Sequence, residues 1–228
     1  MVCHCRFFFA LFSLFRSSLS IGLLERPLVI GLFWGVFNGD LPTSLFIAIF
    51  FELFWLDLIP AGTFIPPHLA ASTFSSLALT TWFQLTNPSQ IMIVMFASMP
   101  LAWVGAKLEG MMRDRQRLSY NRMLNWARNP VDANLPGMII LRSIAATAAV
   151  SWGLFFLTML VFQQAFSFLF EDFPDLLLAL KVQWPHLWIA ATLGGVMALR
   201  VKRAYAILTA GIGFVLFFSI WSVFTWQS

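Results

Sequence analysis

Long apolar runs, separated by short polar or proline-containing interruptions, dominate the hydrophobicity pattern of the chain. A helix needs about 20 apolar residues to cross a hydrocarbon core of about 30 Å. The runs that approach or reach this length, and that we predict to be membrane helices, are residues 7–24, 91–106, 137–163, 184–199 and 204–226. The first run is marginal because Arg16 lies inside it, and a charge at mid-membrane costs about 2.5–3.5 kcal/mol.

The segment from Pro27 to Asn38 is apolar but too short to span a membrane. A helix rises 1.5 Å per residue, so this one would be about 18 Å long. Gly31, Gly35 and Gly39 recur at every fourth position and form a stripe along which another backbone can approach closely. We therefore expect this short helix to be buried against protein.

A second short helix is predicted to run from Asp40 to about Leu58. The Asp40 carboxylate can cap its first N–H groups, and Pro42 is tolerated in a first turn. Small or polar residues share one narrow face of this helix, namely Ser44, Ala48, Glu52 and Trp55. Asp57 lies roughly 140° around the helix from Glu52, so the two acids are not expected to act as a pair.

Prolines interrupt the chain after this helix. Pro60, Pro66 and Pro67 preclude a regular helix between them. Irregular backbone at membrane depth is tolerated only where it is buried in protein or lines a wet cavity. Residues 71–90, rich in Ser and Thr, are predicted to form a loop or a weak re-entrant segment, and the path of residues 7–71 through the membrane stays open.

Basic residues are concentrated in the middle of the chain, where six of the fourteen Lys and Arg residues lie between Lys107 and Arg128. The positive-inside rule predicts that residues 107–135 are cytoplasmic, and interleaved apolar residues predict an interfacial amphipathic helix there. A second basic cluster at residues 200–203 and an acidic loop at residues 171–175 agree with the same orientation.

Composition places the whole chain in a membrane. Hydrophobic residues make up 60% of the 228 residues and charged residues 11%, whereas soluble domains average about 45–50% and 25%. The net charge of +4 does not indicate nucleic-acid binding, because the basic residues lie between apolar spans. We predict one all-α, polytopic integral membrane domain over residues 1–228, with about six to seven membrane helices that include short, re-entrant or broken ones.

The N-terminus offers little chemistry. Cys3, His4 and Cys5 supply at most three metal ligands, and no second cluster completes a site, so we predict neither a metal nor another cofactor. The same terminus has features of a signal peptide, with Ser18 and Ser20 at positions that a cleavage site could use. We favour a retained first membrane helix over cleavage.

Glu52 is the main candidate for chemistry, because a carboxylate on an apolar helix beside a broken helix marks a functional site by default. Broken helices expose free N–H and C=O groups that transporters use to hold polar substrates. A sugar suits such a place, since its hydroxyls need acceptors and its apolar faces stack on an aromatic ring such as Trp55. The alternative is that a protonated Glu52 only bonds to neighbouring backbone for packing.

Residues of the segment 26–72 resemble, in order, the motifs of the membrane subunit IIC of the mannose-family sugar phosphotransferase system (PTS). The residues that carry the resemblance are Arg26-Pro27-Leu28, Gly39-Asp40 with Thr43, Glu52, Gly62 and Pro67. No single motif in this set is specific, and a weaker likeness continues through Gly194-Gly195 and Arg203-Ala204-Tyr205.

The resemblance implies a multi-pass permease of the bacterial inner membrane that binds a hexose-like sugar. It also implies a membrane partner, IID, and the phosphocarriers IIA and IIB; IIB would phosphorylate the translocated sugar, and no catalytic residue is expected on this chain. Homo-oligomerisation stays open. The expected substrate-binding set, led by Glu52 as acceptor of sugar hydroxyls, is Glu52, Trp55, Asp40, Thr43, Asn38, Gly62 and His68.

Two other functions remain alternatives. Pro60 and His68 stand where family members usually carry other residues, which favours a non-transporting membrane scaffold or sensor coupled to phosphocarriers. An intramembrane enzyme could use Glu52, Asp57 and His68 around a metal, but the spacing offers no pair of ligands on one helical face.

Overall fold

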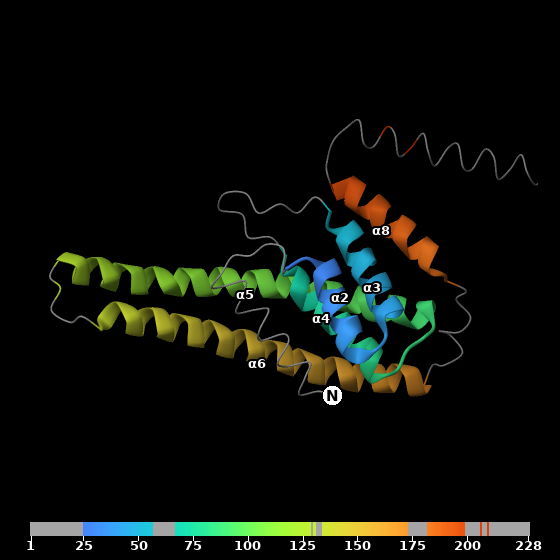
Figure 1. Cartoon of the computed structure of the whole chain (residues 1–228), viewed down its shortest axis with the longest axis horizontal. Coiled ribbons are helices and arrows are strands. Elements are labelled where there is room, and N and C mark those ends of the chain that lie inside the picture. The colour runs from blue at the N-terminus through green and yellow to red at the C-terminus, as the bar shows by residue number, and fades with distance from the viewer. Residues whose placement is uncertain are drawn as a thin grey trace, which may run out of the picture.

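The computed structural model describes residues 25–56, 67–128, 130, 134–172 and 182–198, with 206 and 209. All regular structure in these ranges is helical. The helices are α2 (Pro27–Asn38), α3 (Leu41–Phe54), α4 (Leu69–Trp82), α5 (Pro88–Arg128), α6 (Leu135–Asp172) and α8 (Trp184–Ala198). In Figure 1, α5 and α6 lie side by side as long rods, and α2, α3, α4 and α8 gather beside one end of them.

Helices α2 and α3 form a tight hairpin, as the glycine stripe predicts. Gly39 ends α2 in the left-handed conformation with φ 76°, and the Asp40 carboxylate then caps α3 by accepting from the N–H of Thr43 at 3.2 Å. A Cβ placed on Gly31 would collide with the Ala48 side chain and approach the Ser44 carbonyl oxygen to 2.9 Å. The close approach of the two backbones therefore depends on glycine in α2 and small residues in α3.

The Ser- and Thr-rich stretch is a buried helix, so of the two alternatives for residues 71–90 the loop was wrong for the first half, whereas the weak re-entrant segment stays a prediction. Hydroxyls of α4 donate to carbonyls one turn earlier, for example Ser75 to Ala71 at 2.6 Å and Thr81 to Leu77 at 2.8 Å. Four of the six hydroxyls of α4 are satisfied in this way, those of Ser72, Thr73, Ser75 and Thr81. A segment of low helix propensity can therefore form the centre of the bundle. Only residues 83–87 form the expected connection.

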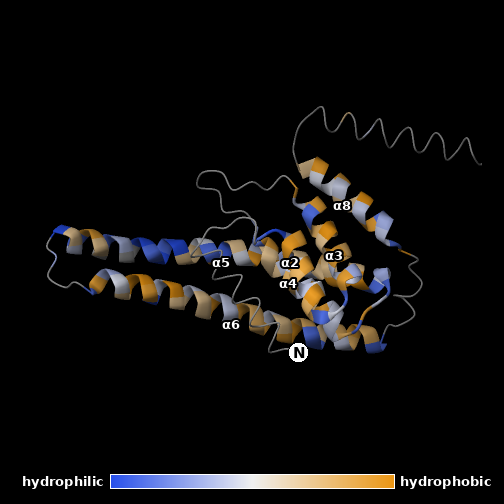
Figure 2. Ribbon diagram, in the orientation of Figure 1, coloured by the Kyte–Doolittle hydropathy of each residue, from blue (hydrophilic) through white to orange (hydrophobic). Residues whose placement is uncertain are grey.

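Helix α5 is a single element of 41 residues from Pro88 to Arg128. We had expected a membrane span over residues 91–106 followed by a separate amphipathic helix, whereas the structure continues one helix through both. At 1.5 Å per residue α5 is about 62 Å long, twice the thickness of a hydrocarbon core. Figure 2 shows the consequence, because the half of α5 that extends away from the short helices is largely hydrophilic, with a few apolar residues between the polar ones.

Helix α6 runs antiparallel to α5 and lies beside both the polar half and the apolar half of α5. Gln116 of α5 donates to Thr147 of α6 at 3.3 Å, and near the other end the rings of Phe83 and Phe170 meet with centroids 5.3 Å apart. The part of α6 beside the apolar residues 91–106 of α5 therefore lies C-terminal to Thr147. The predicted span of 137–163 falls within the candidate span Leu135–Asp172 and stays a prediction.

Helix α8 packs across α3 and completes the surroundings of its last turn. A Cβ on Gly195 would approach the carbonyl oxygen of Leu53 to 2.5 Å, so glycine permits this crossing. Near the start of α8, the indole of Trp188 donates to the carbonyl oxygen of Phe46 at 3.3 Å, and the two rings meet at 5.2 Å. These contacts hold α3 between α2 and α8.

Length and hydropathy agree with a membrane protein. Pro88–Arg117 and Leu135–Asp172 are long and apolar enough to cross a bilayer, and Pro27–Asn38 and Leu41–Phe54 are shorter apolar helices. Large apolar side chains of α6 face outward, including Leu141, Leu157 and Phe168. The all-helical prediction is confirmed for the described residues, whereas six to seven spans remain a prediction, because the segments 7–24 and 204–226 lie outside those residues.

Candidate functional site

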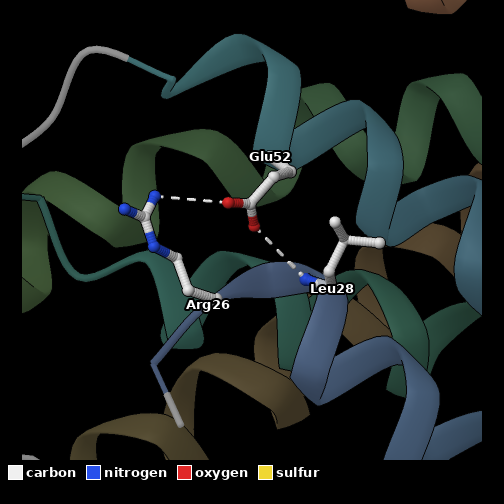
Figure 3. A network of polar contacts seen from close by, with 3 residues as sticks. All are labelled: Arg26, Leu28 and Glu52. Carbon is white, nitrogen blue, oxygen red and sulfur yellow. Dashed lines mark hydrogen bonds and ion pairs between the residues drawn. The ribbon is translucent and has the colours of Figure 1, made fainter. Parts of the chain in front are cut away.

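An ion pair connects the beginning of α2 to the last turn of α3 (Figure 3). Arg26 Nη1 donates to Glu52 Oε1 at 3.2 Å. The backbone N–H of Leu28 donates to the second carboxylate oxygen, Glu52 Oε2, at 3.4 Å. The pair therefore links the open end of the α2–α3 hairpin, opposite the turn at Gly39.

The apolar surroundings explain why these two charges meet. An unpaired charge among apolar helices is costly, and a hydrogen-bonded partner offsets part of that cost. The first N–H groups of any helix also lack partners, so the Glu52 carboxylate serves α2 as an acceptor and as a favourable negative charge. The Glu52 side chain is 17% exposed and that of Arg26 41%, so part of the pair stays accessible.

Trp55, predicted to stack on a sugar, lies in the core of the described structure. Its side chain is only 6% exposed, and its ring stacks on Phe51 with centroids 5.3 Å apart and an interplanar angle of 11°. Phe54 meets it edge-on at 5.4 Å. These aromatic neighbours give Trp55 a packing role beside Glu52, and contact with a sugar stays a prediction.

Asn38, Asp40 and Thr43 lie together at the other end of the hairpin. They line a pocket of about 260 Å³ between the α2–α3 turn and the end of α4. The other polar residues of its lining are Ser44, Thr80, Thr81, Gln84 and Thr86. Twelve positions of helix separate Asp40 from Glu52, which is about 18 Å along α3. The predicted substrate-binding residues thus divide into two groups at opposite ends of α3.

His68 belongs to neither group, since it caps α4. Its Nδ1 accepts from the N–H of Ala71 at 3.2 Å, and its own N–H donates to the Ala102 carbonyl of α5 at 2.8 Å. The residue is buried, and a Cβ on Gly105 would meet it at 2.7 Å. The structure therefore gives His68 a clear structural function. Gly62, Asp57 and Pro60 lie outside the described residues.

Comparison with known protein families identifies the chain. Residues 4–223 match the family model described as the PTS system sorbose-specific IIC component. The chain belongs to this family. It is thus a membrane component of a PTS sugar transporter of the mannose family, whose members act on a sugar together with other PTS subunits. No curated protein and no solved structure gives a significant match.

The family motifs acquire a physical meaning in this arrangement. Arg26-Pro27-Leu28 and Glu52, which are distant in sequence, are the two halves of one ion pair and helix cap. Pro27 suits the first position of α2, where a missing N–H costs nothing. Gly194 and Gly195 pack on Phe54 and Leu53, directly after Glu52.

Sequence reasoning missed two parts of this geometry. Arg26 was noted only as a motif residue, although an arginine and a glutamate in the apolar part of one membrane protein are expected to form an ion pair. The polar lining from α4 was also missed, because the Ser- and Thr-rich stretch was predicted to be a loop or a weak re-entrant segment and no site residue was sought there. Its signal was the run of hydroxyl residues within an apolar chain. Among the described residues, no group of three or more His, Cys, Asp or Glu side chains could hold a metal.

Proposed function

We propose that this chain is the sugar-binding and sugar-translocating IIC subunit of a mannose-type PTS in the bacterial inner membrane. It binds a hexose-like sugar within the membrane, works with the IID subunit, and releases the sugar inward for phosphorylation by IIB, which IIA recharges. The observation that carries the proposal is the partly exposed Arg26–Glu52 pair in a member of this family.

The chemistry of the pair suits a sugar. An ionised carboxylate has about four acceptor positions and a guanidinium has five N–H donors. The contacts of Figure 3 use one donor of Arg26 and two acceptor positions of Glu52, so each side chain retains groups for sugar hydroxyls. Glu52 would accept from hydroxyl hydrogens while Arg26 donates to hydroxyl oxygens, and both bonds are stronger for being charge-assisted.

The orientation of the proposed transport follows from the charge distribution. Arg113, Arg115, Arg117 and Arg128 occupy the polar half of α5, which the positive-inside rule assigns to the cytoplasm. His68, at the start of α4, lies beside Ala102 and Gly105, close to where that polar half begins. The chain is then multi-pass, with α5 and α6 as two of its spans and the basic stretch next to the cytoplasmic phosphocarriers.

Uptake in vesicles tests this function. Vesicles holding the chain with IID, and supplied inside with IIA, IIB and a phosphate donor, are expected to accumulate sugar phosphate from external L-sorbose or D-mannose. Replacing Glu52 by Gln keeps the shape but removes the charged acceptor, so uptake should fall by at least about tenfold, the effect of losing about 1.4 kcal/mol of binding.

The matched control is Glu109→Gln. Glu109 also pairs with an arginine, but both residues belong to α5, where Glu109 accepts from Arg113 one turn later at 2.6 Å. This variant should transport normally. If Glu52→Gln transports as well as wild type, the site assignment is wrong. A lack of sugar phosphate with the wild-type chain would instead support the alternative of a non-transporting scaffold or sensor.

A further inference from the structure

The pocket at the turn of the α2–α3 hairpin is separate from the Arg26–Glu52 pair and has a different chemistry. Its volume is about 260 Å³, and its lining combines hydroxyl and amide side chains with a few apolar ones such as Ile47 and Leu77. Part of that lining is held in place, because Trp34 of α2 donates from Nε1 to Thr81 Oγ1 at 3.0 Å and Thr81 donates onward to Leu77. The pocket is therefore built from α2, α3, α4 and the connection between α4 and α5.

Thr80 is the feature that points to a ligand. Thr80 lines the pocket and is only 5% exposed. Its hydroxyl has no hydrogen-bond partner within the described structure. Other hydroxyls of α4 bond to a carbonyl one turn earlier, as Thr81 and Ser75 do. A buried polar group without a partner is unfavourable, and most such groups in proteins bind another group or water. Because the Thr80 oxygen is itself covered, a ligand hydroxyl in the pocket would reach it through a change of the Thr80 rotamer.

The charge of the lining selects the class of ligand. Among the described residues of the lining, Asp40 is the one charged side chain, and its Oδ1 already accepts from the N–H of Thr43 at 3.2 Å. A phosphate group would meet this carboxylate without a facing cation from that lining, so anionic ligands are disfavoured. A neutral molecule with several hydroxyls can instead donate to Asp40 and exchange hydrogen bonds with Asn38 and Thr80. The pocket therefore fits an unphosphorylated sugar better than a sugar phosphate.

The place of the pocket in the bundle indicates which side of the membrane it faces. Gln84, Leu85 and Thr86 line it and lie just before Pro88, where α5 begins. The basic residues of α5 lie toward its other end, beyond Lys107. With the basic half of α5 in the cytoplasm, the pocket faces the outer side of the membrane, and Arg26–Glu52 lies about 18 Å farther along α3.

From these observations we propose that the pocket is an outward-facing subsite, which holds the neutral sugar before it reaches the Arg26–Glu52 pair. Thr80 and Asp40 would bind hydroxyls of the incoming sugar there. The inference rests on the proposed transport function and deepens it by separating a site of capture from a site of translocation.

Uptake kinetics of Thr80 variants test the subsite. Thr80→Val keeps the shape of the side chain and removes its hydroxyl. Because one neutral hydrogen bond is lost, the external concentration of L-sorbose or D-mannose at half-maximal uptake should rise about three- to tenfold, with the maximal rate unchanged. Thr80→Ser should restore the wild-type value.

Ser76→Ala is the matched control, because the Ser76 hydroxyl is likewise buried without a partner in the described structure but does not line the pocket. It should leave both kinetic values unchanged. If Thr80→Val behaves like wild type, or lowers only the maximal rate, the subsite is refuted.

Cysteine labelling gives a second readout that does not need transport. Thr86→Cys, in a chain with Cys3 and Cys5 replaced by Ser, should react with a membrane-impermeant thiol reagent from outside intact cells, and D-mannose or L-sorbose should slow the reaction. D-mannose 6-phosphate should leave the rate of labelling unchanged. Labelling only from the cytoplasmic side, or no protection by either sugar, would overturn the inference. Protection without uptake by the wild-type chain would overturn the transport function and keep the subsite.

Discussion

The two ends of the α2–α3 hairpin treat their polar groups in opposite ways. At the open end, Arg26 and Leu28 engage both oxygens of Glu52. At the turn, Asp40 uses one oxygen to cap α3, and the nearby Thr80 hydroxyl bonds to nothing in the described structure. One end has its charges paired, and the other has a pocket with unused hydrogen-bonding capacity.

The difference follows from what each end must stabilise in an apolar environment. A full charge is too costly to leave alone, so the open end of the hairpin pairs Glu52 with Arg26. A neutral hydroxyl costs far less, about 1–3 kcal/mol when unsatisfied, so the turn end tolerates the unpaired hydroxyl of Thr80. A carrier that captures a sugar loosely and then holds it more firmly would use weak neutral bonds near the turn of the hairpin and strong charge-assisted bonds at its open end.

The largest effect is expected for Gly31→Leu, which disrupts the contact that holds both ends in register. The new side chain would meet Ala48 and the Ser44 backbone. Because backbone cannot move aside easily, overpacking should cost about 3 kcal/mol or more. Thermal unfolding in detergent should show the loss, together with loss of sugar binding at both ends.

Gly153→Leu is the control for that change, since a Cβ at Gly153 of α6 meets nothing within 4 Å. It should keep the melting temperature of the wild type. Equal melting temperatures for both variants would show that the hairpin does not depend on its glycine contact.

An intermediate effect is expected for the ion pair. Arg26→Gln and Glu52→Gln each leave one charge without its partner, and partial exposure limits the cost to about 1–2 kcal/mol. The double variant should lose less than the sum of the two, so that a double-mutant cycle by thermal unfolding gives a favourable coupling energy. Additive losses would mean that the contact contributes nothing to stability.

The smallest effect is expected at the turn. Asp40→Ala removes the cap of α3, which should cost about 1 kcal/mol, whereas Asp40→Asn keeps a capping oxygen and should cost a few tenths. Chemical denaturation can resolve this difference. If Ala and Asn destabilise equally, Asp40 stabilises the protein through its charge rather than as a cap.

Local features of this fold were predictable because they depend on neighbouring residues. The bounds of α2 at Pro27 and Asn38 were predicted from the sequence, and so was Asp40 as the cap of α3. Such boundaries reflect proline at a helix start, glycine in a left-handed turn and a carboxylate near free N–H groups. The start of α8 at Trp184 was predicted from hydropathy alone.

The two errors have different causes, and in α4 long-range burial overrides local preference. The hydroxyl residues of α4 favour turns in isolation, yet its central position and back-bonding to carbonyls make it a helix. In α5, the change from apolar to basic sequence at Lys107 indicated a boundary, but no residue there terminates the helix. Composition changed at that point while the backbone continued.

The sequence by itself determined that the chain belongs in a membrane, that a short hairpin forms and which family motifs are present. Hydropathy, glycine spacing and residue order are properties of the chain. Only the tertiary structure decided which polar groups meet. It pairs Arg26 with Glu52 across 26 positions of sequence. It also places Asn38, Asp40 and Thr43 in a pocket with Thr80, apart from Glu52. The physical reason is that pairing a charge or opening a pocket depends on which helices pack together, and that depends on contacts spread over the whole bundle.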